Sequence, residues 1–118
     1  MRRTIFVFGS NTEGKHGKGA ALHAVKYFWA NYGNPEGIQG NSYAIVTKDL
    51  TGGKRSIPLK EIADQITKLH KYTVDNPTKD FIVSPIGCGL AGYNVSEIKS
   101  LFTVHNWPEN VYFSSKFL

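Results

Sequence analysis

The sequence lacks several features that would place it in a specialised class of protein. It has one cysteine, Cys88, which excludes an internal disulfide framework, and no Cys/His spacing fits a zinc site. No apolar run approaches the roughly 20 residues needed to cross a bilayer. The run TIFVF follows Met1 to Arg3 directly, without a signal-peptide cleavage pattern. We therefore expect a cytoplasmic protein with no metal, no cofactor and no membrane partner.

Acidic residues are also few, and the charge balance is basic. There are 9 Asp and Glu against 14 Lys and Arg, a net charge of +5 that suits an anionic ligand. The basic residues are scattered, however, and a solvated basic surface also explains them. Together with an aromatic content of 13%, the charge keeps a nucleic-acid-binding protein open as a lower alternative, although no nucleic-acid motif is present.

The remaining composition is that of an ordinary globular domain. The chain has 118 residues, of which 41% are hydrophobic and 19% charged, enough for a core without disulfide or metal support. No repeat, low-complexity segment or linker divides it. We expect one domain over residues 1–118.

Strand-like and helical patterns alternate along the chain. The expected strands are Thr4–Phe8, Ser42–Thr47, Asp80–Ser84 and Val111–Phe113. The alternation predicts an α/β domain with a largely parallel sheet and helices on both faces.

Apolar spacing predicts three helices between these strands. The first runs from Ala20 to about Tyr32, with a buried stripe formed by Ala21, Val25, Phe28 and Tyr32. The second follows Pro58 and buries Leu59, Ile62, Ile66 and Leu69. The third opens at Asn94, which has capping-box spacing to Glu97, and turns Val95, Ile98 and Leu101 inward.

Two glycine-rich stretches, Gly9–Gly19 and Gly87–Gly92, each follow a strand and precede a helix. In open parallel sheets, ligands bind beyond the carboxyl ends of the strands. We therefore expect both stretches to converge on one ligand-binding edge. Backbone N–H groups of Gly87–Gly92 are suited to cradle phosphate, with the helix near Asn94 behind them; a turn without a ligand is the alternative.

The side chains near these stretches allow two interpretations each. Lys15, His16 and Lys18 either are solvated or neutralise a diphosphate, in a loop that fits neither the Walker nor the dinucleotide pattern. Asn11 offers an amide to a ribose hydroxyl or caps its own turn. Lys48, at the end of a strand, is a surface residue or an amine nucleophile.

Cys88 and the remaining histidines offer less chemistry. Nothing in the sequence predicts a histidine beside Cys88, and a small buried side chain in a tight loop is its expected role. His23, His70 and His105 have no spacing typical of a metal site or a catalytic triad.

Three segments resemble macrodomains, and in particular their terminal ADP-ribose glycohydrolase branch. The segment SPIGCGLAGYNVSEIKSLF resembles the second phosphate loop and its helix, HGKGAALHAVKYF the first loop and helix, and SYAIVTK the strand that ends in the catalytic lysine. The three matches occur in the family's order and span about Ile5 to Phe102.

The resemblance implies a three-layer α/β/α fold with a mixed, largely parallel sheet. It also implies binding of an ADP-ribose-type nucleotide or an ADP-ribosylated substrate, with Lys48 at the position of the attacking lysine. The ligand-binding residues that it implies are Asn11, Gly17, Lys18, Gly19, Ala20, Ile86, Gly87, Cys88, Gly89, Leu90, Ala91, Gly92 and Tyr93.

Two departures from the family pattern favour binding over hydrolysis. Ala91 stands where the hydrolytic branch has an aspartate, so acid–base help for a Lys48 adduct is missing from its expected position. The family's N-terminal segment, with its adenine-reading aspartate, is absent before the first strand. The sequence thus predicts a nucleotide-binding module first, and an ADP-ribosyl hydrolase acting through Lys48 as the alternative.

Overall fold

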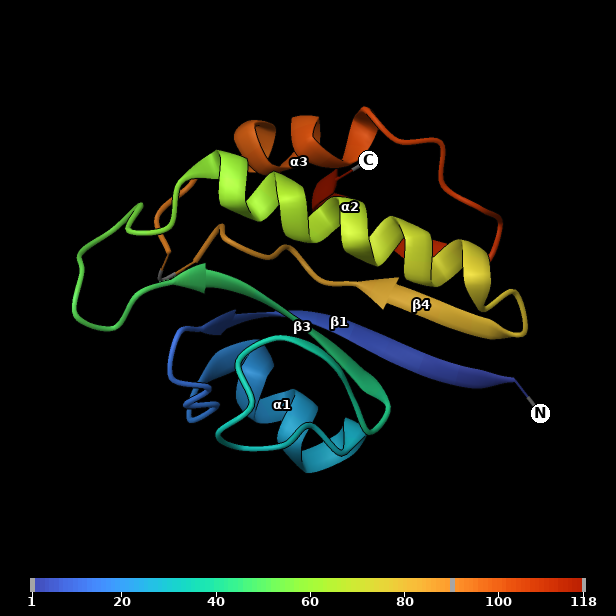
Figure 1. The fold of residues 1–118 in the computed structure, drawn as a ribbon, viewed down its shortest axis with the longest axis horizontal. Helices are drawn as coiled ribbons and strands as arrows, with labels where there is room; N and C mark the ends of the chain where they lie inside the picture. The colour runs from blue at the N-terminus through green and yellow to red at the C-terminus, as the bar shows by residue number, and fades with distance from the viewer. Residues whose placement is uncertain (1, 90, 118) are drawn as a thin grey trace.

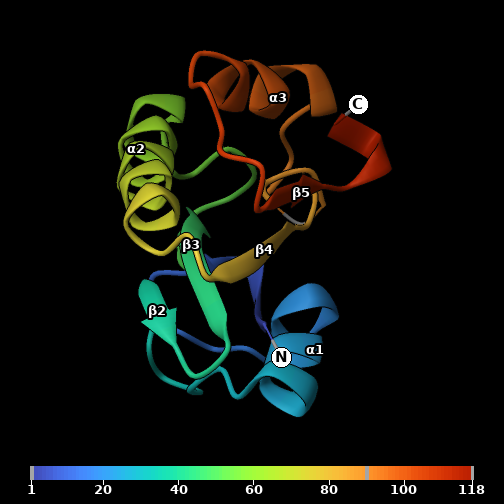
Figure 2. The ribbon, with the colours of Figure 1, turned by 90° about the vertical axis from the view of Figure 1, so that its right-hand side faces the viewer.

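Five strands form one mixed sheet in the order β2-β3-β1-β4-β5. Strands β3, β1 and β4 are labelled in Figure 1, and β2 and β5 in Figure 2. The computed structural model describes residues 2–89 and 91–117. The strands are β1 (Arg3–Asn11), β2 (Gly37–Gln39), β3 (Ser42–Lys48), β4 (Lys79–Val83) and β5 (Val111–Phe113). The pairs β1–β3, β1–β4 and β4–β5 are parallel, and β2 runs antiparallel to β3. The prediction of a mixed, largely parallel sheet is confirmed.

Helices cover both faces of this sheet. Helix α1 (Gly19–Phe28) lies on one face, and α2 (Leu59–Asp75) and α3 (Val95–Thr103) lie side by side on the other (Figure 2). A short 3-10 helix, η1 (Ser115–Phe117), follows β5 and packs near α3. The three-layer α/β/α prediction is confirmed. Within the described residues, no helix has the length and apolar character of a membrane span.

The alternation of side chains along the central strands builds two cores. Ile5 and Val7 of β1 are fully buried in the larger core, which α2 and α3 cover. Phe8 of the same strand points into the smaller core under α1, together with Ala24 and Ala44. Successive strand residues face opposite sides, so β1 serves both cores at once. The small alanine side chains let α1 pack close to the sheet.

Helix α1 is shorter than predicted. It ends at Phe28, because Trp29 adopts the left-handed conformation with a φ of 61° and donates its N–H to the carbonyl of Ala24. Tyr32 therefore lies outside the helix and is 63% exposed, so its predicted place in the buried stripe is wrong. Of that stripe only Ala21 is buried, and Val25 and Phe28 are half-buried.

The largest difference among the strand boundaries is at β1, which continues to Asn11, so residues 9–11 lie within the strand and not after it as predicted. Strand β2 and the inward face of α3 also differ from the prediction. The edge strand β2 has three residues, too few to show an alternating pattern in the sequence. In α3 the fully buried residues are Ile98 and Phe102, four positions apart, whereas Leu101 is half-buried. The inward face of α3 is thus rotated slightly from the predicted one.

Candidate functional site

A cavity of about 630 Å³ is lined by residues at and just beyond the carboxyl ends of β1, β3 and β4; the arrow of β3 ends toward the left of Figure 1. Both glycine-rich stretches contribute to its wall, so the predicted convergence at the carboxyl edge of the sheet is what the structure shows. The predicted site residues that line it are Asn11, Gly17, Lys18, Gly19, Ala20, Lys48, Ile86, Gly87, Gly89 and Ala91.

The first loop, between β1 and α1, is organised by Asn11. Its Oδ1 accepts the N–H of Lys15 at 2.9 Å, and its Nδ2 donates to the carbonyl of Lys15 at 3.0 Å. The carbonyl of Gly14 accepts the N–H of Gly33 at 2.7 Å and ties the loop to the segment after α1. The Asn11 side chain thus has the turn-capping role that the sequence left open, while still bordering the cavity.

His16 anchors the same loop in the protein interior. Its side chain is 1% exposed, its Nε2–H donates to the carbonyl of Asn34 at 3.0 Å, and its ring meets Phe8 edge-on. Its Nδ1 has no partner among the described residues. His16 is therefore neither a solvated charge nor a cavity-lining cation. Both roles that the sequence left open for it are wrong.

The second loop, between β4 and α3, turns some of its residues away from the cavity. Cys88 is half-buried, its Sγ donates to the carbonyl of Ile86, and burial raises the pKa of its thiol. Tyr93 is buried and donates its hydroxyl to the carbonyl of Ile57. Neither these two residues nor Gly92 line the cavity. Leu90, also predicted for the site, lies outside the described residues.

The helix N-terminus at the cavity belongs to α1. Gly19 and Ala20, in its first turn, line the wall, where N–H groups have no intrahelical acceptor and favour an anion. The start of α3 near Asn94 does not line the cavity. There the Glu97 carboxylate accepts the N–H of Asn94 at 3.0 Å; this bond, followed by Arg55, lowers the pKa of Glu97.

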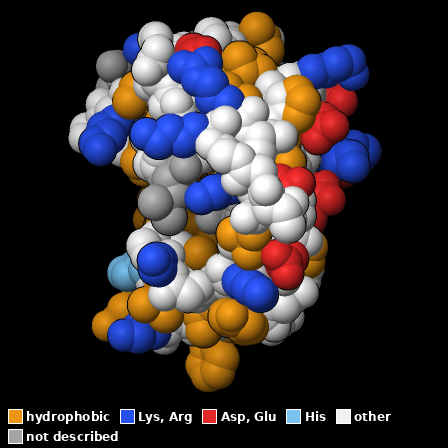
Figure 3. All heavy atoms as spheres, turned by 90° about the vertical axis from the view of Figure 1, so that its left-hand side faces the viewer, with side chains coloured by type: hydrophobic (Ala, Val, Ile, Leu, Met, Phe, Trp, Pro, Cys, Tyr) orange, Lys and Arg blue, Asp and Glu red, His pale blue; other side chains and the backbone are white. Residues whose placement is uncertain are grey.

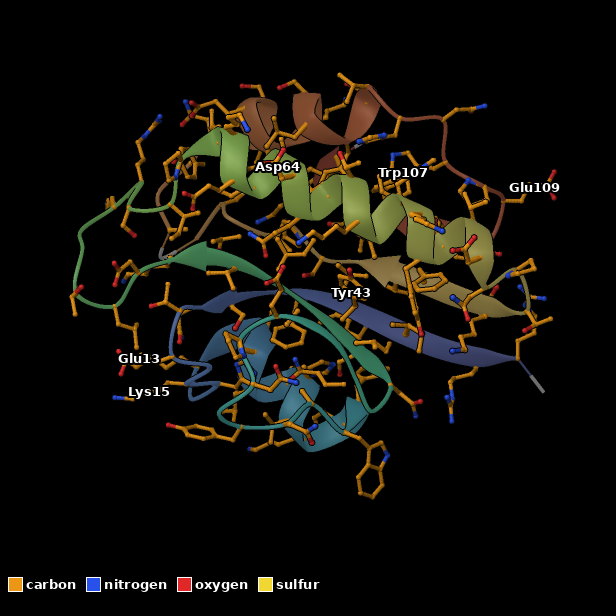
Figure 4. All side chains as sticks on the ribbon, viewed as in Figure 1. Glu13, Lys15, Tyr43, Asp64, Trp107 and Glu109 are labelled. Carbon is orange, nitrogen blue, oxygen red and sulfur yellow. The ribbon has the colours of Figure 1, made fainter. Side chains whose placement is uncertain are left out.

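The cavity wall is electropositive. Lys15, Lys18 and Lys48 line it, and the described lining residues include no carboxylate. Lys15 projects from the first loop beside Glu13, with Nζ 3.5 Å from the carboxylate (Figure 4). Lysine and arginine side chains spread across this whole face, whereas acidic ones gather toward one side (Figure 3). An anionic ligand therefore meets a complementary field here.

Lys48 and Asp49 are adjacent in sequence but differ in their surroundings. Lys48 is half-buried at the end of β3, paired in register with Asn11, and lines the cavity. The Asp49 carboxylate instead accepts the N–H of Thr51 at 3.0 Å, the main cause of its lowered pKa. Asp49 is not a lining residue, so it does not replace the missing aspartate.

Several lining residues were not predicted from the sequence. They are Gly9, Ser10, Ala21, Thr47, Leu50, Ser84 and Pro85. Ser10 and Thr47 could have been found as polar residues at the ends of apolar strands; both are buried, and Thr47 Oγ1 donates to the Ser10 carbonyl at 3.3 Å. Leu50 lies in the loop after β3 and gave no such signal.

Over the described residues, no cluster of three or more His, Cys, Asp or Glu could hold a metal ion.

The layer order, the sheet topology and the cavity at the carboxyl edge define a macrodomain fold. The chain superposes on the macrodomain of Mycobacterium tuberculosis DarG with a TM-score of 0.61 and 15% identity, over 92% of this chain and 86% of that one. The macrodomain prediction is confirmed at the level of the fold.

Two further solved structures share this fold. Thermosipho africanus DarTG, in complex with ADP-ribose, matches with a TM-score of 0.60 and 20% identity over 98% of this chain, which spans 39% of that protein. A protein of unknown function from Bacteroides thetaiotaomicron matches with a TM-score of 0.68 and 14% identity, over 97% of this chain and 89% of that one. Protein-family models and curated proteins give no match.

Proposed function

We propose that this protein binds ADP-ribose or a related ADP-ribose-derived nucleotide in the cavity between its two glycine-rich loops. The observation that carries the proposal is the cavity itself: the first turn of α1 and three lysines border it, and no described lining residue is acidic. This arrangement suits a diphosphate. One structure of the same fold, T. africanus DarTG, is a complex with ADP-ribose, which supports the ligand class.

The glycines Gly17 and Gly89 support the proposal in a second way. A Cβ at either position would have no heavy atom within 4 Å, and neither residue has a positive φ. The protein's own packing and backbone therefore do not require glycine there. Both residues line the cavity, and a ligand that approaches the backbone closely would account for the missing side chains.

Titration calorimetry with ADP-ribose tests the proposal, with Gly17→Ala as the informative variant. We expect binding by the wild-type protein and a loss of about tenfold in Gly17→Ala, the equivalent of one phosphate contact of about 1.4 kcal/mol. Gly53→Ala is the matched control, because Gly53 also has open space around its Cβ position but does not line the cavity. Absence of binding at about 1 mM ADP-ribose contradicts the proposal, because that concentration would detect even a binding free energy of only about 4 kcal/mol.

A hydrolase that uses Lys48 is the second candidate, and the position of Lys48 in the cavity wall favours it. Its amine would attack the anomeric carbon of an ADP-ribosyl group and displace the linked substrate; water would then cleave the adduct. Both steps move protons, for which Ala91 supplies no carboxylate. We therefore place binding above hydrolysis.

Release of ADP-ribose from an ADP-ribosylated substrate separates the two candidates. Hydrolysis through Lys48 predicts release by the wild-type protein and its loss in Lys48→Ala, while Lys26→Ala, on the last turn of α1 and outside the cavity, keeps it. Binding alone predicts no release by any of the three. Release that survives in Lys48→Ala would contradict the lysine mechanism.

A further inference from the structure

The loop between β3 and α2, residues 49–58, rests on the second glycine-rich loop through Arg55. The backbone N–H of Arg55 donates to the carbonyl of Ala91 at 2.7 Å. Arg55 has a φ of 59°, a conformation that is unfavourable for a side chain with a Cβ. Such a conformation persists only where the surrounding contacts hold it in place.

The Arg55 side chain supplies those contacts. Its guanidinium donates two hydrogen bonds to the Glu97 carboxylate, at 2.9 and 2.8 Å, and lies 5.0 Å from the centre of the Tyr93 ring. Most exposed ion pairs contribute little, but a bidentate arginine–carboxylate pair with a stacked ring is the favourable exception. Arg55 thus contacts the second loop through Ala91 and Tyr93, and α3 through Glu97.

Lys54, the preceding residue, fits the second loop in a complementary way. A Cβ at Gly92 would lie 2.7 Å from the Cβ of Lys54 and 3.0 Å from its Cγ. The lysine stem therefore occupies the space that a side chain at residue 92 would need. The two loops are shaped for each other at this contact, which gives Gly92 a role away from the cavity.

The contact also determines the shape of the cavity. Leu50, from the β3–α2 loop, and Ala91, from the second glycine-rich loop, both line the cavity wall. Arg55 connects the two loops directly, so its contacts set the distance between these two parts of the wall. A ligand that touches both parts must prefer the seated loop.

We propose that Arg55 is a positioning residue that keeps the β3–α2 loop seated on the second glycine-rich loop and so completes the binding cavity. The ligand part of this inference rests on the proposed function. If the seated loop raises the affinity for the ligand, the ligand must favour the seated loop by the same factor. Loop seating and ligand affinity can therefore be measured in separate experiments, and a variant that weakens the seating must also weaken the binding of the ligand.

Limited trypsin digestion measures loop seating without any ligand. Trypsin cleaves after Lys54 and Arg55, and mass spectrometry identifies both products. Glu97→Gln weakens the bidentate pair but keeps both cleavage sites and an oxygen acceptor for the Asn94 N–H. We expect cleavage there to be about fivefold faster than in the wild-type protein. Asp80→Asn, which weakens the ion pair with Arg2 elsewhere on the surface, is the control and leaves the rate unchanged.

Addition of ADP-ribose then tests the coupling. We expect ADP-ribose to protect the bonds after Lys54 and Arg55 in the wild-type protein, and Glu97→Gln to bind it about fivefold more weakly. Arg55→Lys keeps a cation and the cleavage site but not the bidentate geometry. We therefore expect it to bind ADP-ribose more weakly than the wild-type protein. The melting temperature of each variant shows whether the effect is general destabilisation.

The outcomes separate this inference from the proposed function. Equal cleavage of wild type and Glu97→Gln overturns the seating role, even if ADP-ribose binds. Faster cleavage with unchanged affinity overturns the positioning role. Faster cleavage in a protein that does not bind ADP-ribose overturns the proposed function and leaves the seating role standing.

Discussion

Trp29 and Arg55 are the described non-glycine residues that have a positive φ, and they are held in different ways. Arg55 is fixed by its contacts with a neighbouring loop and helix. Trp29 is 73% exposed and ends α1, where glycine is the usual residue in this conformation. The strain at Trp29 therefore has little compensation from its own side chain.

Replacing Trp29 should accordingly stabilise the protein. Trp29→Gly removes the left-handed penalty, and we expect the free energy of unfolding to rise by about 0.5–1 kcal/mol after the entropy cost of glycine. Urea denaturation measures the change. Tyr27→Gly, within α1 and also exposed, should lose about 1 kcal/mol. A loss in Trp29→Gly would show that the indole contributes packing that outweighs the strain.

Gly14 is expected to be the least replaceable glycine of the first loop. It has a φ of 66°, and a Cβ there would lie 2.5 Å from the carbonyl carbon of Gly33. Gly14→Ala should cost about 2–3 kcal/mol in unfolding free energy, since the backbone must move as well as adopt a strained φ. Gly37 also has a positive φ, of 85°, but open space around its Cβ position, so Gly37→Ala should cost only about 1 kcal/mol. Equal losses in chemical denaturation would contradict the steric part of the argument.

At the residue scale, the sequence predicted positions better than contacts. Lys48 and Gly17 could be placed at one edge because parallel strands end together. The pairing of Arg55 with Glu97 could not be predicted, since it joins a loop to a helix 42 positions away. The burial of His16 could not be predicted from the sequence either, because its hydrogen-bond partner is a backbone carbonyl and not a side chain that the sequence would identify.

Among the elements, α2 and the segment that leads to β5 meet at a pair of histidines. The rings of His70 and His105 stack with their centres 4.9 Å apart, and Trp107 lies edge-on to both. His70 donates its Nε2–H to the carbonyl of Asn106 at 2.8 Å. Burial lowers the pKa of His105, and the neighbouring His70 lowers it further.

This pair predicts a loss of stability in mild acid. A histidine whose pKa is lowered by folding binds its proton more readily in the unfolded chain, so the free energy of unfolding should fall as pH drops below about 6.5. The fall continues to the lowered pKa of His105. Denaturation midpoints measured between about pH 7.5 and pH 5 should show a shallower slope in His105→Asn than in the wild-type protein. An unchanged slope would assign the acid sensitivity to other groups.

Element types were predictable, whereas element ends depended on tertiary contacts. The apolar spacing of α2 matched its buried face closely because this helix packs on a broad sheet face, whereas the buried face of α3 is rotated slightly from the predicted one. Helix α1 ended early because Trp29 turns the chain toward β2. A Cβ at Gly40, beside that strand, would lie 2.2 Å from the carbonyl oxygen of Trp29. Such close approaches between distant segments leave no local signal in the sequence.

For the whole molecule, the net charge of +5 predicts salt-sensitive binding. The cavity face carries lysines that attract an anionic ligand, and salt shortens the range of that attraction from about 10 Å at 0.1 M to about 3 Å at 1 M. We expect the affinity for ADP-ribose to fall at least about threefold over this range. Lys18→Gln should flatten the dependence, while Lys60→Gln, on α2 and outside the cavity, should not. A salt-independent affinity would contradict an electrostatic contribution.

The α/β class and the three layers followed from the alternation of strands and helices alone. The order of the strands did not follow from it. It depends on which crossovers place β1 between β3 and β4, and on the short antiparallel strand β2 that extends the sheet beyond β3.

The central position of β1 has a consequence for synthesis. β1 leaves the ribosome before its partners β3 and β4, which emerge only after long intervening segments of the chain. Until then the nascent protein carries an unpaired, apolar, β-prone segment of the kind that associates between chains. Helix α1 and the antiparallel pair β2–β3 emerge after β1, and the edge of β1 that pairs with β4 stays unpaired until β4 has also emerged. The pace of translation through residues 12–48 should therefore influence the yield of folded protein.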